Sequence, residues 1–185
     1  MPTAIDDRIH GTLVDLFQTS RETYAGNRLI ESFGVGLTYR QVGVVADAVT
    51  VWLQGQGLGA GDRVAVMMPN VAAYMPVVFG ILQAGCTVVN VNPLYTPNEL
   101  AHQLRDSGAK TIFVIAQFEH TVKAATADVP VDRVVRVKLG DLLGFKGHLV
   151  TYVGGKKTPV KKDGQIPGAV AFADVVRTGR GGRPR

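Results

Sequence analysis

Gly155-Lys156-Lys157-Thr158 is the segment whose residue types come nearest to a phosphate-binding loop. In such a loop, backbone amides and a lysine ammonium surround phosphate oxygens, and a further glycine stands upstream at a fixed spacing. That upstream glycine is missing, and the segment lies between an expected helix and a polar stretch rather than after a strand. A basic loop exposed to solvent is therefore the prediction for this segment.

Other side chains capable of metal binding or nucleophilic catalysis are scattered along the chain. The histidines are His10, His102, His120 and His148, and the serines considered as nucleophiles are Ser20, Ser32 and Ser107. The histidines lack the i, i+4 pairing and acidic partners of a metal site. The serines lack the glycine pattern of a nucleophile elbow, and no pair of carboxylates has a context for acid–base work. We predict no catalytic residue, no cofactor-binding residue and no metal ligand in this chain.

Cys86 is the single cysteine, so an internal disulfide and a multi-cysteine metal site are excluded. It begins the run Cys86-Thr87-Val88-Val89, in which a buried, unreactive thiol is the expectation. The sequence from Met1 to His10 has no apolar segment of the secretory type. Both observations favour a cytoplasmic protein.

Apolar runs that alternate with amphipathic segments define the elements expected to position these residues. Strands are predicted at residues 64–68, 87–91, 111–115 and 133–137, and a small hairpin at 29–37. Helices are predicted at residues 10–24, 38–55, 71–84, 97–107, 119–127 and 141–153, with one more short element at 169–176. Thr38 and Asn70 are the expected N-caps of two of these helices, Pro97 begins another and Gly108 ends it. Short buried strands alternating with helices predict an α/β fold with a mostly parallel sheet covered by helices on both faces.

Residues 71–89 contain no charged side chain and are about as long as a membrane span. Pro76, Gly80 and Gly85 interrupt this stretch, and neither aromatic nor basic clusters flank it. A buried helix leading directly into a buried strand is the preferred interpretation.

Charge and composition divide the chain into four parts. Residues 1–153, the expected domain, contain 12 basic and 13 acidic residues, whereas residues 154–185 contain 8 basic and 2 acidic ones. Residues 154–168 are expected to be a basic flexible loop, 169–176 a short continuation of the domain and 177–185 a disordered Arg/Gly-rich tail. The excess of positive charge thus belongs to the tail, and no nucleic-acid partner is predicted; a nonspecific contact of the tail with DNA or RNA is the alternative.

Three segments resemble the adenylate-forming enzymes, and more narrowly their bacterial long-chain fatty-acid–CoA ligases. Residues 37–42 read LTYRQV and resemble the first core motif of that family; residues 61–70 read GDRVAVMMPN and resemble the stretch that follows it. Residues 79–100 read FGILQAGCTVVNVNPLYTPNEL and resemble the second core motif in the wording of the fatty-acid ligases. Within these motifs we expect scaffold roles, for which the candidates are Gly57, Gly59, Gly61, Asp62, Gly80, Gly85, Asn90 and Asn92.

The resemblance implies a reaction in two steps, in which ATP with Mg²⁺ activates a fatty acid as acyl-adenylate and CoA then displaces AMP. It also implies fatty acid, ATP and CoA as partners, a homodimer through the N-terminal region, and at most peripheral contact with a membrane. The family's Ser/Thr/Gly-rich loop ending in lysine, its acidic metal contact and its C-terminal lysine domain do not occur between Met1 and Arg185. The expectation is an N-terminal fragment that is inactive alone, with a non-catalytic binding or dimerising module on the same scaffold as the alternative.

Overall fold

A five-stranded parallel sheet forms the centre of the molecule in the computed structural model, which describes residues 11–157 and 159–184. The strand order is β4-β3-β5-β6-β7, and every neighbouring pair is parallel. These strands are β3 (Arg63–Met67), β4 (Thr87–Asn90), β5 (Thr111–Ile115), β6 (Arg133–Val137) and β7 (Val170–Ala171). The α/β class and the parallel sheet are confirmed, with β7 as a strand that the sequence marked only as a short element.

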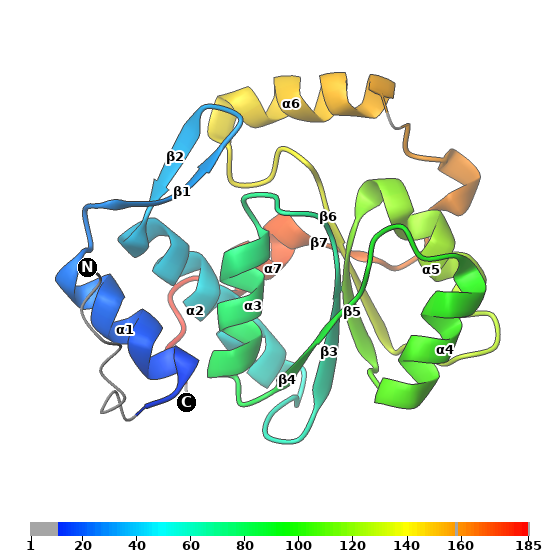
Figure 1. Ribbon diagram of the computed structural model, residues 1–185, viewed down its shortest axis with the longest axis horizontal. Coiled ribbons are helices and arrows are strands. Elements are labelled where there is room, and N and C mark those ends of the chain that lie inside the picture. The colour runs from blue at the N-terminus through cyan, green and yellow to red at the C-terminus, as the bar shows by residue number, and fades with distance from the viewer. Residues whose placement is uncertain (1–10, 158, 185) are drawn as a thin grey trace, which may run out of the picture.

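Helices cover both faces of this sheet, as Figure 1 shows. The α-helices are α1 (Leu13–Thr23), α2 (Tyr39–Gly55), α3 (Tyr74–Gln83), α4 (Pro97–Ser107), α5 (Glu119–Ala125), α6 (Gly144–Lys157) and α7 (Phe172–Gly179). Two 3-10 helices, η1 (Ala116–Phe118) and η2 (Lys162–Gly164), lie beside α5 and after α6. Parallel strands need crossover connections, and α3 to α5 supply them on both sides.

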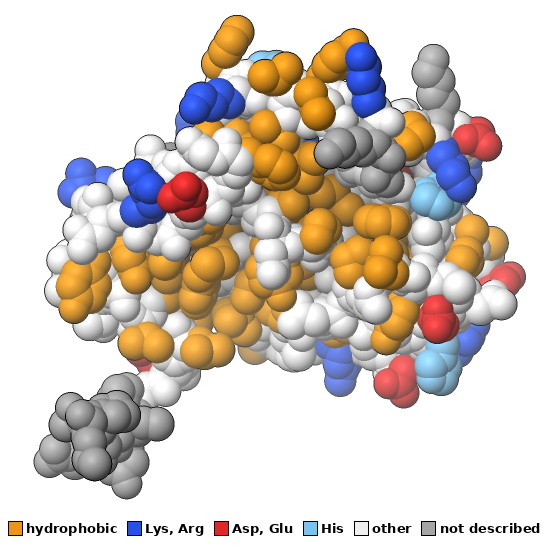
Figure 2. Space-filling model, turned by 45° about the horizontal axis from the view of Figure 1, so that its top comes forward, with side chains coloured by type: hydrophobic (Ala, Val, Ile, Leu, Met, Phe, Trp, Pro, Cys, Tyr) orange, Lys and Arg blue, Asp and Glu red, His pale blue; other side chains and the backbone are white. Residues whose placement is uncertain are grey.

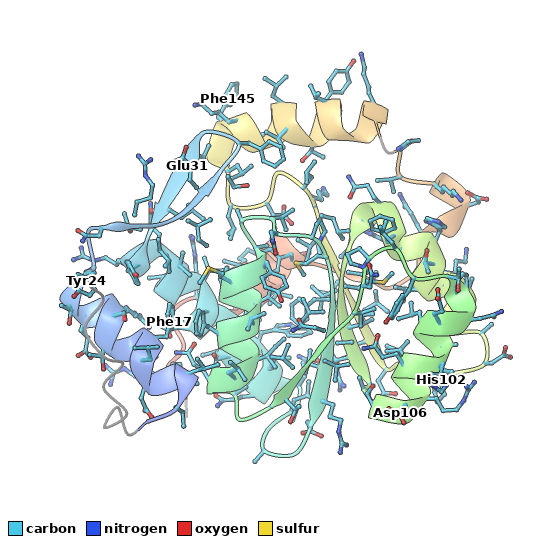
Figure 3. All side chains as sticks on the ribbon, viewed as in Figure 1. Phe17, Tyr24, Glu31, His102, Asp106 and Phe145 are labelled. Carbon is cyan, nitrogen blue, oxygen red and sulfur yellow. The ribbon has the colours of Figure 1, made fainter. Side chains whose placement is uncertain are left out.

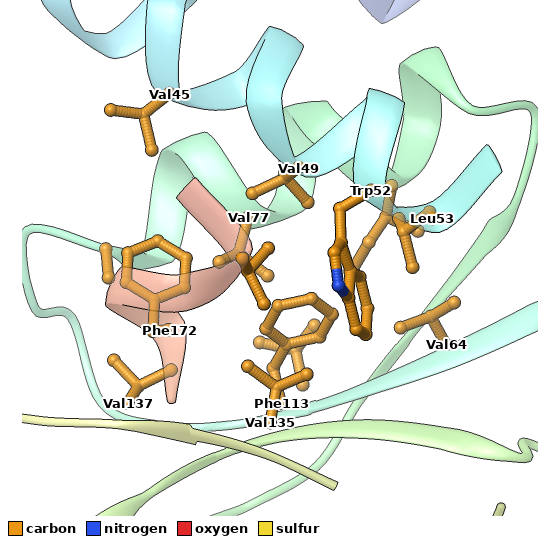
Figure 4. Close-up of a cluster of buried hydrophobic side chains, with 14 of the residues drawn as sticks. Val45, Val49, Trp52, Leu53, Val64, Val77, Phe113, Val135, Val137 and Phe172 are labelled. Carbon is orange, nitrogen blue, oxygen red and sulfur yellow. The ribbon is translucent and has the colours of Figure 1, made fainter. Parts of the chain in front are cut away.

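The larger core lies between the sheet and helices α2, α3 and α7. Figure 4 shows Trp52 and Phe113 at its centre, with their ring centroids 6.2 Å apart in an edge-to-face arrangement. Phe172 of α7 is 1% exposed and packs into the same cluster. On the opposite face, Leu100 and Leu104 of α4 pack with residues of β3, β5 and α5. The continuous apolar strands of the sequence are thus explained by burial on two sides.

An antiparallel hairpin lies outside the sheet and connects α1 to α2. It consists of β1 (Arg28–Ser32) and β2 (Val35–Thr38), with Gly34 in the left-handed region at φ 69°. Thr38 then caps α2: its hydroxyl accepts from the Gln41 amide, and the Gln41 side chain accepts from the Thr38 amide. The predicted hairpin and the predicted cap are both confirmed.

Local signals fixed both ends of α4. Thr96 and Glu99 form a capping box, Pro97 stands in the first turn, and Gly108 ends the helix at φ 68°. The hydrogen bonds from the Thr96 backbone and hydroxyl lower the pKa of the Glu99 carboxyl, since they stabilise its charged form. The predicted start and end of this helix are confirmed.

The expected cap at Asn70 is wrong. The helix α3 begins at Tyr74, its N-cap is Ala73, and residues 72 and 73 form a turn instead of helix. Asn70 does not begin the helix because the Val71 amide donates a hydrogen bond to the Pro69 carbonyl. This short-range bond holds the chain out of helical geometry. The rest of this stretch follows the prediction, since a buried helix leads into β4. Within the described residues, no helix has the length and apolar character needed to cross a membrane.

The C-terminal part departs most from the prediction. Residues 154–157, expected in a flexible loop, form the last turn of α6, and residues 177–179, expected in a disordered tail, belong to α7. The physical reason is tertiary: α7 packs on α2, and Gly179 has no side chain, so its backbone can touch that of Ala48. Gly182 likewise approaches Val51.

Candidate functional site: the carboxyl edge of the sheet

The carboxyl ends of the parallel strands meet at one edge of the sheet, where α/β proteins commonly bind ligands. The segments leaving this edge include Pro69-Asn70 after β3, Val91-Asn92 after β4, η1 after β5 and Lys138-Leu139 after β6. Helix α6 lies across the same end of the molecule (Figure 1). The edge is therefore enclosed by loops on one side and by α6 on the other.

An apolar cleft of about 610 Å³ opens beneath α6. Its lining residues are Phe33, Pro69, Ile115, Gln117, Phe118, Leu139, Leu149, Val150, Val153 and Gly154. Figure 2 shows hydrophobic side chains filling the hollow between α6 and the body of the molecule. The hairpin, the strand ends and α6 together build an apolar surface of the kind that accommodates an apolar ligand.

A second cleft, of about 560 Å³, lies beside the first and shares Pro69 and Phe118 with it. Its polar side chains are three asparagine amides and the Tyr74 hydroxyl. The Asn90 Oδ1 accepts from the Tyr74 hydroxyl at 3.0 Å, and the Asn92 Oδ1 accepts from the Leu94 amide at 3.0 Å. These bonds give the two asparagines structural contacts, and because both also line the cleft, their scaffold role stays a prediction.

A third and more polar hollow, of about 950 Å³, separates the first turns of α2 from α6. Arg40, Lys138, Asp141, His148 and Arg180 are among its lining residues. Burial raises the pKa of the Asp141 carboxyl, opposed by the hydrogen bond that its Oδ2 accepts from the Lys138 amide at 2.8 Å. One carboxylate among several cations gives this hollow a positive character.

A buried ion pair holds the segments behind the first cleft together. Glu119 is 1% exposed and accepts two hydrogen bonds from the Arg136 guanidinium, at 2.5 and 2.6 Å. Its Oε1 also accepts from the Ile166 amide at 2.7 Å. The pair raises the pKa of Arg136, chiefly through the hydrogen bonds to Glu119. The sequence did not predict these contacts, because Arg136 and Ile166 lie 17 and 47 residues away from Glu119 along the chain.

Most residues examined for chemistry in the sequence are kept apart by the fold. Figure 3 shows His102 on the outer surface of α4, whereas His120 lies on α5 with its Nδ1 3.1 Å from the Gln117 carbonyl. His148 borders the third hollow, and His10 lies outside the described residues. Among the residues that the structure describes, no group of three or more His, Cys, Asp or Glu side chains could hold a metal ion.

Cys86 is 4% exposed and packs in the larger core, as expected of a structural thiol. Burial raises its pKa, and the nearby Asp62 raises it further, so the reactive thiolate is disfavoured. Asp62 serves the turn before β3, where its Oδ2 accepts from the Gly59 amide at 2.8 Å. Gly57 and Gly61 adopt positive φ in this turn, which confirms their predicted role.

The segment Gly155-Lys156-Lys157 lies in the last turn of α6, so its amides are engaged in a helix instead of a phosphate-binding loop. At the carboxyl edge itself, the linings of the two neighbouring clefts carry amides but neither a carboxylate nor a cation. Mg²⁺ with ATP requires carboxylate or phosphate oxygens around the metal and positive groups around the phosphates. The described residues that line these two clefts do not fit that group, whereas they fit an apolar ligand.

The chain matches the family model described as "AMP-binding enzyme" over residues 17–163. It is 40% identical over 181 residues to a long-chain-fatty-acid–CoA ligase of Escherichia coli O157:H7, and 38% identical over 182 residues to one of Yersinia pestis. Each alignment covers 97% of this chain and 32% of the relative. The chain thus spans about a third of the length of these curated relatives.

Solved structures share the fold at lower identity. The apo structure of Mycobacterium smegmatis MbtA matches with a TM-score of 0.73 and 23% identity, over 95% of this chain and 28% of that one. The anthranilate CoA ligase AuaEII, solved with anthranoyl-AMP, matches with a TM-score of 0.72 and 22% identity, over 92% of this chain and 28% of that one. The arrangement of sheet and helices is therefore one that both of these larger chains contain as a part.

Proposed function

Since the chain belongs to the AMP-binding enzyme family, we propose that it forms the amino-terminal part of a long-chain fatty-acid–CoA ligase. The observation that carries the proposal is 40% identity to such a ligase across 97% of this chain. The apolar cleft beneath α6 supports it, because a long-chain acid is the kind of substrate that an apolar lining accommodates.

The proposed reaction joins a fatty acid to CoA in two steps. A carboxylate oxygen of the acid forms a bond to the α-phosphorus of ATP while the bond to pyrophosphate breaks, giving acyl-adenylate. The CoA thiolate then attacks the acyl carbon, and AMP leaves with the electron pair of the broken acyl–oxygen bond. ATP, Mg²⁺ and CoA belong to this reaction in the whole enzyme.

For this chain we propose a framework role. Its sheet, its buried Glu119–Arg136 pair and its apolar cleft would hold and shape one side of the acyl site, while the groups that neutralise phosphate charge come from the other two thirds of the enzyme. This division is supported by the linings of the first and second clefts, which carry no charged side chain that could hold Mg–ATP. We accordingly propose that the 185-residue chain alone neither binds ATP tightly nor forms acyl-CoA.

A chimera tests the proposal directly. Residues 1–185 would replace the matching third of the E. coli O157:H7 ligase, and ATP-dependent formation of palmitoyl-CoA would be measured for the chimera and for the 185-residue chain. We expect turnover by the chimera and none by the chain alone, because only the chimera contains both parts. A control chimera carrying Glu119→Ala should be less stable than the parent chimera, which urea unfolding followed by circular dichroism would report.

Two outcomes would contradict the proposal. A folded chimera without ligase activity on any long-chain acid would contradict the assignment to fatty-acid ligases. Turnover by the purified 185-residue chain would leave the assignment standing and would overturn the framework role.

Exposed apolar side chains on α1 favour a second candidate, a dimerising module. Leu13 is 65% exposed and Leu16 53% exposed on this helix. In this alternative, two copies associate through α1, and replacing both leucines by serine returns the chain to a monomer in sedimentation equilibrium. For its location we propose the cytoplasm, with at most peripheral contact with a membrane, since a chain with one cysteine has no internal disulfide to maintain.

A further inference from the structure

Gln117 places an amide without a hydrogen-bond partner in the wall of the first cleft, the one of about 610 Å³ beneath α6. Among the residues that the structure describes, three buried side-chain oxygens have no partner: Gln103 Oε1, Thr111 Oγ1 and Gln117 Oε1. Of these three residues, only Gln117 lines one of the clefts described above. Since buried polar atoms in proteins are nearly always paired, an unpaired one in a cleft wall points to a ligand that supplies the partner.

The backbone around Gln117 is fixed by several hydrogen bonds. Gln117 lies in η1, directly after β5, and is 8% exposed. Its carbonyl oxygen is 3.1 Å from the His120 Nδ1, and the Ala116 carbonyl accepts from the Glu119 amide. Glu119 is itself held by its side-chain bonds to β6. The Gln117 amide therefore has a defined place in the cleft wall.

Gln117 stands at the inner end of a lining that is otherwise apolar. Every other residue of this lining has an apolar side chain, apart from Gly154, which has none. Ile115 and Gln117 are the buried residues of the lining, whereas Phe33 and Leu149 are 57% and 65% exposed. The first two thus form the inner end of the cleft, and the last two belong to its rim.

A hydroxyl group is the ligand group that best complements a glutamine amide. Oε1 accepts a hydrogen bond and Nε2 donates one, and rotation of the amide can turn either atom toward the cleft. A hydroxyl both donates and accepts, whereas a hydrocarbon does neither and a carboxylate only accepts. A carboxylate at this end of the cleft would also lack a positive partner, because no side chain of the lining is charged.

We propose that the first cleft binds a long-chain acid with a hydroxyl group at or near the far end of its chain, and that Gln117 recognises this hydroxyl. The long-chain acid itself rests on the proposed function. Its carboxylate is charged and stays at the rim, where water or the rest of the enzyme can solvate it. The group that reaches Gln117 is therefore remote from the carboxylate, which identifies the ligand class as ω-hydroxy acids.

In this arrangement Gln117 determines specificity and takes no part in the chemistry. A site that binds a substrate hydroxyl disfavours the analogue that lacks it, because the polar group of the protein is then left unpaired. The cleft volume of about 610 Å³ lies within the range of pockets that enclose small molecules, about 300 to 1,000 Å³.

Displacement of a fluorescent fatty acid from the 185-residue chain tests the recognition without ATP or CoA. We expect 16-hydroxypalmitic acid to bind about threefold to tenfold more tightly than palmitic acid, the effect of one hydrogen bond between uncharged groups. The 16-fluoro acid is similar in size but cannot donate, so it should bind no better than palmitic acid. The 2-hydroxy acid carries its hydroxyl beside the carboxylate and should bind as palmitic acid does.

Gln117→Leu removes both hydrogen-bonding atoms while keeping a side chain of similar size. It should bind palmitic acid as tightly as the parent or more tightly, and 16-hydroxypalmitic acid at least about tenfold more weakly than the parent does, because the hydroxyl then enters an apolar site without a partner. The matched control is Gln103→Leu. Gln103 also has an unpaired Oε1, but its Nε2 donates to the Asn90 carbonyl at 2.8 Å and it is not part of this lining, so both affinities should keep their ratio.

Three results would overturn the assignment of Gln117. They are equal affinities of the parent chain for palmitic and 16-hydroxypalmitic acid, equal losses of both affinities in Gln117→Leu, and no displacement of the fluorescent acid by either compound. The first comparison uses the parent chain alone, so it stands even if Gln117→Leu fails to fold.

The chimera with the E. coli ligase separates this assignment from the proposed function. In an active chimera, Gln117→Leu should lower the ratio of kcat/KM for 16-hydroxypalmitic acid to that for palmitic acid by about tenfold or more. An active chimera whose ratio does not change would overturn the role of Gln117 alone. An inactive chimera, together with a preference of the 185-residue chain for the hydroxy acid, would contradict the proposed function and support the recognition by Gln117.

Discussion

Glu119 shows how one buried carboxylate can hold three separate segments together. It begins α5, receives two hydrogen bonds from Arg136 of β6 and one from Ile166, which precedes β7. Its charge is removed from water, with 1% of the side chain exposed, and the guanidinium and the amide replace the lost hydration. Glu119 thus links the segment before β7 to both α5 and β6.

Glu119→Ala should lower the free energy of unfolding by about 3 kcal/mol, because it leaves the Arg136 charge and the Ile166 amide without their partner. Urea unfolding followed by circular dichroism would measure the change. The matched control is Glu31→Ala, which breaks the pair between Arg28 and Glu31, whose side chains are 64% and 59% exposed. Exposed pairs contribute about 1 kcal/mol or less, so equal losses in the two variants would contradict the assigned role of Glu119.

For single residues, the sequence correctly predicted the roles of those that act on their immediate neighbours in the chain. Thr38, Pro97 and Gly108 mark helix ends through bonds or dihedral angles within a few residues, and the structure confirms each of them. Asn70 failed because the Val71 amide binds the Pro69 carbonyl, an equally local alternative that the residue types do not distinguish. The partners of Glu119 could not be found in this way, since only the fold brings them together.

The packing of α2 on α3 depends on the absence of a side chain at Gly80. A Cβ atom there would lie 2.6 Å from the Val49 Cβ and 2.8 Å from the Ala46 carbonyl oxygen. The buried Thr50 hydroxyl lies 2.9 Å from the Ala46 carbonyl and 3.0 Å from the Gly80 carbonyl, which ties the two helices together at the same point. Sequence reasoning placed Gly80 at a close helix contact, and the structure confirms it.

Gly80→Ala should destabilise the protein by about 1 to 3 kcal/mol, because α2 and α3 must separate to admit the methyl group. Alanine has the higher helix propensity, so the sign of the effect reports packing alone. Gly55→Ala is the control within α2, since nothing lies within 4 Å of the Cβ position there. It should be neutral or stabilising by up to about 1 kcal/mol, and a stabilising Gly80→Ala in the same urea titration would show that the helices have room.

The helix ends that were predicted wrongly are those without a capping residue or another local signal in the sequence. Residues 154–157 contain two glycines and two lysines, a composition typical of loops, yet they complete α6 over Leu139. Residues 177–179 follow Val175 and Val176, whose burial against α2 extends α7 to Gly179. In both places the contacts that stabilise the helix come from segments far away in the sequence.

For the molecule as a whole, the apolar strands were enough to predict a parallel sheet with two covered faces. The first cleft could not be predicted in the same way, because its walls come from the hairpin, the ends of β3 and β5, the loop after β6, and α6. Phe33 and Leu149 face one cleft although 116 positions separate them along the chain. Such a surface exists only once the long-range packing is complete.

The C-terminal segment closes the larger core, and removing it should damage the whole molecule. Phe172 and Val175 of α7 are 1% and 0% exposed and pack with residues of β5 and β6. A chain that ends at Gly168 would expose this apolar face of the sheet to water, so we expect it to lose cooperative urea unfolding and to bind the dye ANS. A chain that ends at Arg180 retains β7 and α7, and should unfold in a single transition like the parent. Cooperative unfolding of the shorter chain would mean that α2 and α3 alone suffice to cover this face, and that the burial of Phe172 contributes little to the fold.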